Sequence, residues 1–241
     1  TGGGGHLGSR MSETILELGA KVIVVGQYAE KILPLTKRFG NRISFISIDL
    51  NDKESVLSLR EKLPTPLHIC INNAYTWPTQ VHFEKADWDA VEKTLVSGIL
   101  SPIFVSQIAF EKMTEGGSVI NIASMYGMVS PDFRMYRDSG MGNAIEYGAA
   151  KAAIIQMTKY LAVKGAPKGI RVNAISPGPF SKPGAFDNGK EWFREELNAK
   201  VPLGRIGENR ELKGTIAFLA SDLSSYMTGQ NLVVDGGWTV W

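Results

Sequence analysis

Six short apolar runs, each about the length of a β-strand, constrain the fold of this chain most strongly. They are VIVV at 22–25, ISFISI at 43–48, HICI at 68–71, SVINI at 118–122, RVNAI at 171–175 and NLVV at 231–234. Between most of them, apolar residues recur at helical spacing, as at Leu7, Met11, Ile15 and Leu18. Such alternation is typical of parallel strands that helices cover on both faces. The pattern predicts an α/β fold, a Rossmann-like doubly wound parallel sheet.

Length and composition favour one domain. A chain of 241 residues with 44% hydrophobic residues suits one large core better than two small ones. We therefore expect residues 1–241 to form a single dinucleotide-binding and catalytic domain. Residues 176–188 are rich in Pro, Gly and Ser. Loops of that length are often functional, so 176–200 is predicted to be a substrate lid.

Charge and cysteine content argue against several classes of protein. The 26 basic and 24 acidic residues leave a formal charge of +2, with no long run of one sign that would suit nucleic acid or an anionic membrane. The lone cysteine, Cys70, excludes an internal disulfide and a multi-cysteine zinc site. His68 and His82 suggest no metal-ligand cluster. No apolar run approaches a membrane span of roughly 20 residues, so a cytoplasmic protein is expected. The cysteine and histidine content predicts that the protein binds no metal.

The glycine-rich start of the chain suggests a phosphate site. Gly3-x-Gly5-x-x-Gly8 fits the dinucleotide fingerprint, in which bare backbone and a helix N-terminus meet a pyrophosphate. The amphipathic helix that begins at Leu7 and the strand at 22–25 complete a βαβ unit. These two features favour a real turn over a flexible tail.

The fingerprint normally follows a strand at the centre of the sheet. We therefore expect about half a dozen apolar residues before Thr1, the length of an ordinary strand. With that strand, the sheet would have about seven.

The residues that usually distinguish NAD from NADP leave both cofactors open in this sequence. After the run at 22–25 come Gly26, Gln27 and Tyr28, so both the acid that grips a ribose and the arginine that accepts a 2′-phosphate are missing. Gln27 could bond either ribose, and a phosphate without an arginine partner would be poorly compensated, which slightly favours NAD over NADP. Asp49 could meet the adenine edge or cap a helix.

Tyr147 and Lys151 lie four residues apart, which places a phenol and an ammonium on one face of a helix. A neighbouring cation favours phenolate, so the pair could exchange a proton with a substrate alcohol near neutral pH. Ser124 ends the run SVINIAS at the carboxyl edge of the sheet, where doubly wound folds bind ligands. These three residues are the candidate catalytic group.

Further motifs complete a resemblance to a known family. Asn72-Asn73-Ala74, Pro177-Gly178 and Asp235-Gly236-Gly237 follow the third, fifth and sixth runs. With the glycine turn and YGAAK at 147–151, essentially the whole chain resembles the short-chain dehydrogenases/reductases of the compact, single-domain kind. The resemblance implies hydride transfer between a substrate carbon and a nicotinamide, with Tyr147 as general acid/base.

The resemblance also implies roles for single residues. Lys151 would lower the pKa of Tyr147 and hold the nicotinamide ribose, and Ser124 would bond the reacting oxygen. Family members are commonly tetramers, so a homo-oligomer, a tetramer or a dimer, is expected. The contacts to NAD or NADP would come from Gly2, Gly5, His6, Leu7, Gly8, Gln27, Asp49, Leu50, Asn73, Ala74, Tyr147, Lys151, Pro177, Gly178 and Phe180.

Some positions depart from the family pattern. Gly2, Gly5 and Gly8 follow the spacing of the larger, extended relatives, and His6 stands where a glycine is usual, so its ring is expected to point away from the pyrophosphate. Three other substitutions concern catalysis and substrate binding. Leu95 stands where an asparagine often anchors a proton-relay water, Lys182 replaces a threonine, and Tyr75 replaces a glycine and is predicted to line the substrate pocket.

Ser124 and Tyr147 are farther apart than in most members, which makes 125–146 an expected substrate-loop insertion. In it, Arg134, Tyr136 and Arg137 could hold a phosphate, a carboxylate or a sugar, or could instead serve a subunit contact or solvent. The segment is similar to one in relatives linked to flagellin-glycan and legionaminic-acid biosynthesis and to gluconate-type dehydrogenases.

The chain is therefore predicted to be an NAD(P)-dependent oxidoreductase of carbohydrate metabolism. It would interconvert a secondary alcohol and a ketone on a small molecule, a sugar or nucleotide-sugar. The alternatives are a nucleotide-sugar epimerase or dehydratase, and a non-catalytic dinucleotide sensor.

Overall fold

Each of the six predicted apolar runs forms a strand. The computed structural model describes residues 1–187 and 189–241. All the strand pairs described are parallel, and the helices cover both faces, as predicted. The strands are β1 (Val22–Gly26), β2 (Ile43–Ser47), β3 (Ile69–Asn72), β4 (Gly117–Ile122), β5 (Ile170–Pro177) and β6 (Asn231–Val234).

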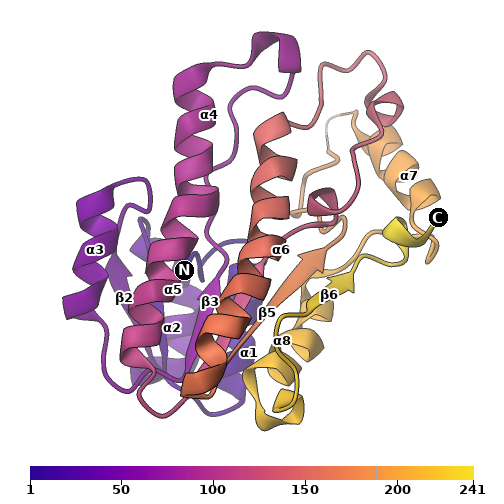
Figure 1. The fold of residues 1–241 in the computed structure, drawn as a ribbon. Helices are drawn as coiled ribbons and strands as arrows, with labels where there is room; N and C mark the ends of the chain where they lie inside the picture. The colour runs from indigo at the N-terminus through magenta and orange to yellow at the C-terminus, as the bar shows by residue number, and fades with distance from the viewer. Residues whose placement is uncertain (188) are drawn as a thin grey trace.

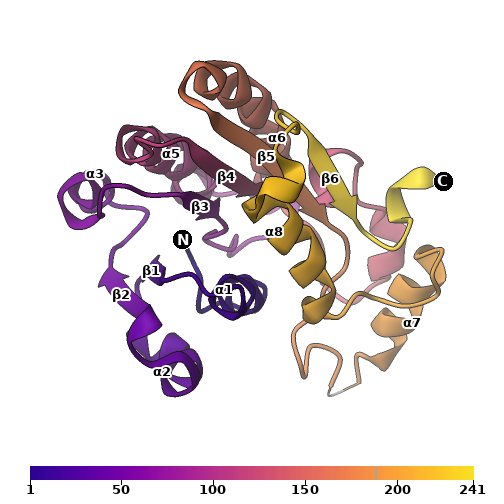
Figure 2. The same ribbon diagram turned by 90° about the horizontal axis from the view of Figure 1, so that it is seen from below.

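The helices form a layer on each side of the strands. Figure 2 shows α3, α5 and α6 on one face and α1, α2 and α8 on the other. A π-helical turn, Val96–Leu100, joins α4 and α5 into one long rod (Figure 1). The helices are α1 (Gly8–Glu17), α2 (Leu33–Phe39), α3 (Lys53–Lys62), α4 (Trp88–Leu95), α5 (Ser101–Lys112), α6 (Ile145–Gly165), α7 (Glu191–Lys200) and α8 (Lys213–Ala220).

The sheet is divided, which departs from the single sheet expected. β1 pairs with β2, and β3, β4, β5 and β6 form a second sheet in that order. A cleft of about 630 Å³ lies between the two, lined by apolar residues of β1 and β3. The first residues bridge it, because the nitrogen of Thr1 donates to the Ile71 carbonyl (2.7 Å) and that of Gly2 to the Val25 carbonyl (2.8 Å). The strand expected before Thr1 stays a prediction, and this cleft is its predicted place.

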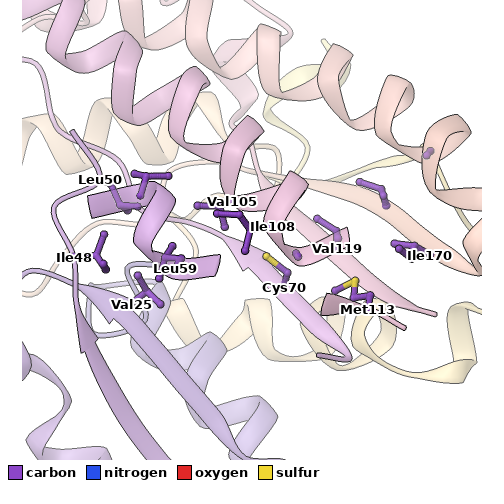
Figure 3. Packing of buried hydrophobic residues seen from close by; sticks show 14 residues of the cluster. Val25, Ile48, Leu50, Leu59, Cys70, Val105, Ile108, Met113, Val119 and Ile170 are labelled. Atoms are coloured by element: carbon purple, nitrogen blue, oxygen red, sulfur yellow. The ribbon is translucent and has the colours of Figure 1, made fainter. Parts of the chain in front are cut away.

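The largest apolar cluster lies between the strands and the layer of α3 and α5 (Figure 3). Leu59, Ile108 and Val119 are fully buried in it. Burial of each such side chain contributes roughly 1.5–3 kcal/mol. A second cluster, around Ile120, Ile175 and the residues of α8, fills the opposite face. The two clusters hold β3, β4 and β5 in register, so the residues that follow these strands meet at one edge.

The helix Trp88–Lys112 is 25 residues long and apolar enough to cross a membrane by length and composition. This corrects the expectation that no segment approaches a membrane span. Half of its most apolar window is buried inside the protein, and α5 packs on α3 and β3. Since core helices of α/β folds share this character, the helix is weak support for a membrane location.

Candidate active site

The glycine turn is too tight for side chains at four of its positions, Gly2, Gly3, Gly4 and Gly8. A Cβ on Gly8 would lie 2.1 Å from the Gly2 carbonyl oxygen, and one on Gly3 would lie 2.5 Å from Ser12 Oγ. Gly2 has a φ of +64°, a conformation that glycine adopts readily. At Gly5, by contrast, a Cβ would meet only the Gly2 oxygen, at 3.3 Å. The turn therefore leaves bare backbone at the start of α1.

The turn is held by the Asn-Asn-Ala motif that follows β3. Thr1 Oγ1 accepts hydrogen bonds from the backbone nitrogens of Asn73 (3.2 Å) and Ala74 (3.1 Å), and Asn73 Nδ2 donates to the Gly2 carbonyl (3.1 Å). Among residues 1–187 and 189–241, no side chain caps the N-terminus of α1, and the first turn of this helix holds no acidic residue. A helix end of this kind suits a phosphate. These residues thus fit a dinucleotide, with Gly2, Gly5, Leu7 and Gly8 nearest its pyrophosphate by prediction.

The His6 ring lies against residues 180–182 of the loop after β5. Burial is the main cause that lowers the pKa of His6, and the charge of Lys182 acts in the same direction, while the backbone of Ser181 and Phe180 opposes both. His6 Nε2 is buried without a hydrogen-bond partner among the described residues. That the ring points away from the pyrophosphate stays a prediction.

The end of β1 presents Gln27 and Tyr28 to solvent, as a ribose site requires. The sequence analysis missed Lys31, whose Cβ would lie 2.8 Å from a Cβ on Gly4 and whose Nζ lies 4.3 Å from the centre of the Tyr28 ring. The base of the Lys31 side chain therefore lies beside the glycine turn, while its ammonium lies over Tyr28. Lys31 lies shortly after the second strand of the βαβ unit, and this position could have identified it from the sequence.

Asp49 does not cap a helix, which corrects one of its two expected roles. It accepts a hydrogen bond from the nitrogen of Asn51 (2.9 Å), whereas Asp52 caps α3 by accepting from the nitrogen of Ser55 (2.7 Å). Leu50 is buried in the largest apolar cluster, and its carbonyl accepts from Ser101 Oγ. The adenine contact of Asp49 stays a prediction.

A chain of buried hydrogen bonds fixes β4 against β3 and α6. Asn72 Nδ2 donates to Asn121 Oδ1 (2.8 Å), and Asn121 Nδ2 donates to Thr158 Oγ1 (2.9 Å). Unpaired polar atoms at such depth would be costly, so the three side chains hold their elements in one arrangement. Ser124 follows β4, and α6 carries Tyr147 and Lys151 one turn apart.

The candidate catalytic residues meet at the edge where β4 ends. Ser124 is buried, and its side chain lies beside Tyr147 and acts to lower the pKa of the phenol. Lys151 Nζ donates to the Ile122 carbonyl (2.8 Å) and lies 5.8 Å from the centre of the Tyr147 ring. Burial lowers the pKa of Lys151 to about 8. The structure thus brings together all three residues that the sequence spacing selected.

The pKa of Tyr147 moves in the direction opposite to that expected from its lysine neighbour. Burial is the main cause and raises the pKa, while the polar side chain of Ser124 acts to lower it. Two aromatic rings account for this burial. The Trp77 ring stacks on Tyr147 with centres 5.3 Å apart, and Tyr75 contacts Tyr147 edge-on at 5.2 Å. The sequence analysis selected Tyr75 and missed Trp77, which stands two residues farther along the chain.

Leu95 ends α4 directly before the π-helical turn. Segments of π-helix are frequent at functional sites. The nitrogen of Thr76, between Tyr75 and Trp77, donates to Ser97 Oγ in this turn (3.0 Å). The hydrogen bond ties the aromatic segment to the long helix.

The insertion 125–146 packs against α7, and its arginines have partners within the protein. The Arg134 side chain is 91% exposed and pairs with Asp132 (2.9 Å). Arg137 pairs with Glu196 of α7 and lies over the Trp192 ring, 4.8 Å from its centre. Lys200 of α7 also pairs with Asp132.

Tyr136 is buried in an apolar cluster with Met125, Leu197 and Trp238, where its ring contacts Phe193. Contact of Tyr136, Arg134 or Arg137 with substrate stays a prediction.

The predicted lid, 176–200, consists of the end of β5, a loop and α7. Asn188, the last residue of the expected loop, lies outside the described residues. At the end of β5, which includes Pro177, Gly178 lies close to Asp235, because a Cβ on Gly178 would be 2.6 Å from Asp235 Cα. Phe180 packs on Gly207 in the same way. These contacts anchor the start of the loop beside the catalytic edge.

Comparisons with known proteins agree with this geometry. A family model described as Enoyl-(Acyl carrier protein) reductase matches residues 6–239. A 7alpha-hydroxysteroid dehydrogenase of Bacteroides fragilis is 30% identical over 250 residues, which cover 100% of this chain and 93% of the relative.

Two solved structures share the fold over nearly the whole chain. A short-chain dehydrogenase from Leptospira borgpetersenii with bound NAD+ has a TM-score of 0.82 and 32% identity, covering 99% of this chain and 90% of that chain. A gluconate 5-dehydrogenase from Burkholderia cenocepacia, in complex with NADP and tartrate, has a TM-score of 0.86 and 25% identity, covering 100% of this chain and 94% of that chain. With Ser124, Tyr147 and Lys151 assembled at the sheet edge, these matches show that the chain belongs to the short-chain dehydrogenase/reductase family of oxidoreductases.

Proposed function

We propose that this protein is an NAD(P)-dependent oxidoreductase that interconverts a secondary alcohol and a ketone on a sugar or nucleotide-sugar. The observation that carries the proposal is the meeting of Ser124, Tyr147 and Lys151 at the edge where the glycine turn and Asn73 also lie. When bound, the nicotinamide cofactor supplies or accepts the hydride. The residues of the chain supply the proton transfer and the positioning.

Tyr147 exchanges the proton of the substrate oxygen. In the oxidative direction its phenolate takes the hydroxyl proton while the C–H bond loses a hydride, and in the reductive direction its phenol returns the proton. Ser124, whose side chain lies beside Tyr147, orients the same oxygen. Lys151 contributes a positive charge beside the ring at pH values below about 8, since burial lowers its pKa to about that value.

The sugar class rests on two supports. One is the gluconate 5-dehydrogenase among the solved neighbours. The other is the insertion 125–146, which begins at the catalytic edge, because the nitrogen of Tyr126 donates to Ser124 Oγ (3.2 Å). The cofactor preference is proposed to be NAD, because Gln27 rather than an arginine follows β1. Lys31 would favour NADP if it met a 2′-phosphate, so direct binding of both cofactors should be compared.

A homo-oligomer is proposed from exposed apolar side chains on neighbouring helices. Phe104 on α5 is 40% exposed, and Val163 on α6 is 79% exposed. Contacts between copies would cover such a surface. Light scattering at several concentrations measures the assembly. We also propose a cytoplasmic location.

The central experiment measures turnover of sugar alcohols and nucleotide-sugars by the near-ultraviolet absorbance of the reduced nicotinamide. Tyr147→Phe removes the proton acceptor, so we expect kcat to fall by at least roughly 100-fold. Net oxidation changes the absorbance, whereas epimerisation or dehydration does not. Product formation without an absorbance change would contradict the proposed reaction, and unchanged turnover by Tyr147→Phe would contradict the role of this residue.

A further inference from the structure

Three aromatic rings form a compact group at the candidate active site. Trp77 is nearly parallel to Tyr147, with an angle of 17° between the rings and 5.3 Å between their centres. Tyr75 stands edge-on to both, 5.2 Å from Tyr147 and 5.8 Å from Trp77. Offset stacking and edge-to-face contacts are the favoured geometries of aromatic pairs. The group is therefore a packed unit.

The Tyr75 ring occupies a specific position, its seat, between Gly98 and Lys151. Its Cε2 would lie 2.8 Å from a Cβ on Gly98, so only glycine at that place in the π-helical turn admits the ring. On the other side, Lys151 Nζ lies 4.8 Å from the ring centre. The hydroxyl of Tyr75 is buried without a hydrogen-bond partner within the described part of the chain. The seat thus fits an aromatic ring and makes no use of the hydroxyl.

Trp77 is held in contact with the candidate acid/base and is also open to solvent. One face of its ring stacks on Tyr147, yet the residue is 64% exposed. A large apolar surface beside a proton-transferring group would meet any substrate whose oxygen reaches Tyr147. An indole face offers a large, flat apolar contact area, and a ring presents a broader and more rigid face to it than an open chain does.

We propose that Tyr75 and Trp77 form an aromatic recognition surface that selects substrates whose reacting alcohol or ketone is carried on a ring. The inference rests on the proposed function and narrows its substrate class to cyclic compounds. In oxidation, the substrate C–H bond breaks and its hydride reduces the oxidised nicotinamide cofactor. The O–H proton passes to Tyr147 and a C=O bond forms on the ring.

The first test compares cyclic and open-chain substrates of equal carbon number. Cyclohexanol is paired with hexan-2-ol and myo-inositol with sorbitol, each with NAD and with NADP, on the pH-independent plateau of each variant. The wild type should prefer the cyclic member in kcat/KM. Trp77→Ala should reduce that preference by roughly tenfold, as expected for a lost apolar pocket contact, whereas Trp77→Phe should keep most of it. Trp88→Ala, an exposed tryptophan on α4, is the matched control.

The second test examines the seat of Tyr75. Tyr75→Phe should retain the cyclic preference, because the hydroxyl has no partner in the described structure. Gly98→Ala should reduce the preference although both rings remain, because the added methyl displaces Tyr75. Circular dichroism and thermal melting confirm that each variant is folded. An equal loss for cyclic and open-chain substrates in Trp77→Ala, or an unchanged ratio, overturns the inference.

Binding without turnover separates this inference from the proposed reaction. Equilibrium dialysis of Tyr147→Phe with cofactor measures the affinities for cyclohexanone and hexan-2-one, and the double variant Tyr147→Phe/Trp77→Ala is measured in parallel. Selective loss of cyclohexanone binding in the double variant supports the aromatic surface even if no substrate is turned over, in which case the proposed reaction alone fails. Equal binding of both ketones by both proteins overturns the inference even where turnover is found.

Discussion

At the scale of single residues, Tyr147 shows how its surroundings alter a residue that spacing alone identifies. Four-residue spacing predicted Lys151 as its neighbour and a phenol that ionises easily. Lys151 instead directs its ammonium to the Ile122 carbonyl, while Trp77 and Tyr75 cover the Tyr147 ring. Burial disfavours the phenolate, so the pKa rises despite the nearby cation. The packing around the phenol, to which both rings contribute, therefore opposes its ionisation.

Trp77→Ala should lower the pKa of Tyr147, because water would reach a phenol whose pKa burial now raises. Oxidation requires the phenolate, so its rate rises with pH towards this pKa, and the rising limb of the pH–rate profile should move to lower pH. The measurement is log kcat against pH with a saturating alcohol substrate. Trp88→Ala should leave the limb in place. A limb that stays in place or moves to higher pH in Trp77→Ala would contradict the assignment.

Leu95→Asn should leave activity intact or raise it. Leu95 stands where many family members have an asparagine that anchors a relay water, and a leucine side chain offers water no hydrogen bond. Steady-state and single-turnover rates measure the effect on the chemical step. Leu95→Ala controls for the loss of the apolar side chain. A large fall in the chemical step of Leu95→Asn, with folding preserved, would count against this alignment of the helix.

At the scale of elements, the insertion 125–146 and α7 pack together beside the catalytic edge. Arg137 and Lys200 connect the two through Glu196 and Asp132, and Tyr136 packs on Phe193. Arg137 also has a φ of +47°, which is uncommon for a residue with a side chain. The ion pair and the Trp192 ring hold it there. The backbone conformation of Arg137 therefore depends on α7 as much as on the insertion 125–146.

Arg137→Ala should raise KM for neutral and anionic substrates alike, because it removes the contact of the insertion with Glu196 and Trp192. Arg134→Ala should have a small effect, since its side chain is 91% exposed and its ion pair lies within the same loop. Kinetics with a neutral sugar alcohol and a sugar acid provide the comparison. If either variant lost only the anionic substrate, direct recognition of the anion by that arginine would be supported instead.

At the scale of the whole molecule, the main feature is that the strands form two separate sheets, one of β1 and β2 and one of β3 to β6. β1 and β3 face each other across the cleft, and Thr1 and Gly2 connect them through hydrogen bonds. A parallel strand in this place would pair with both neighbours and cover their apolar side chains. Such a strand would also aim the glycine turn at the cofactor.

An apolar segment of about six residues added before Thr1 should raise the midpoint of thermal unfolding by at least about 5 °C, since it would bury apolar surface and pair two open strand edges. Differential scanning calorimetry of the 241-residue chain with and without the segment measures the change. A glycine-serine segment of equal length is the control. Equal midpoints for the apolar and the control segment would show that the cleft does not accept a strand.

Local patterns in the sequence determined much of the fold and of the candidate active site. The six strands, the turn at Gly2 to Gly8 and the Tyr147–Lys151 pair could be predicted because each depends on residue types at short, regular spacing. Ser124 could be predicted because it follows a strand at the edge where doubly wound folds bind ligands. Helical and strand periodicities are properties of neighbouring residues, and parallel strands bring their carboxyl ends to a common edge.

Contacts between distant segments were decided only by the tertiary structure. Trp77 reaches Tyr147 from another part of the chain, Gly98 admits Tyr75, Arg137 meets Glu196, and the sheet divides between β1 and β3. Each depends on how elements pack, and packing and burial set the pKa of Tyr147 against the direction that its sequence neighbour favours. Local spacing carries no information about which distant ring will exclude water, so only the packed structure reveals it.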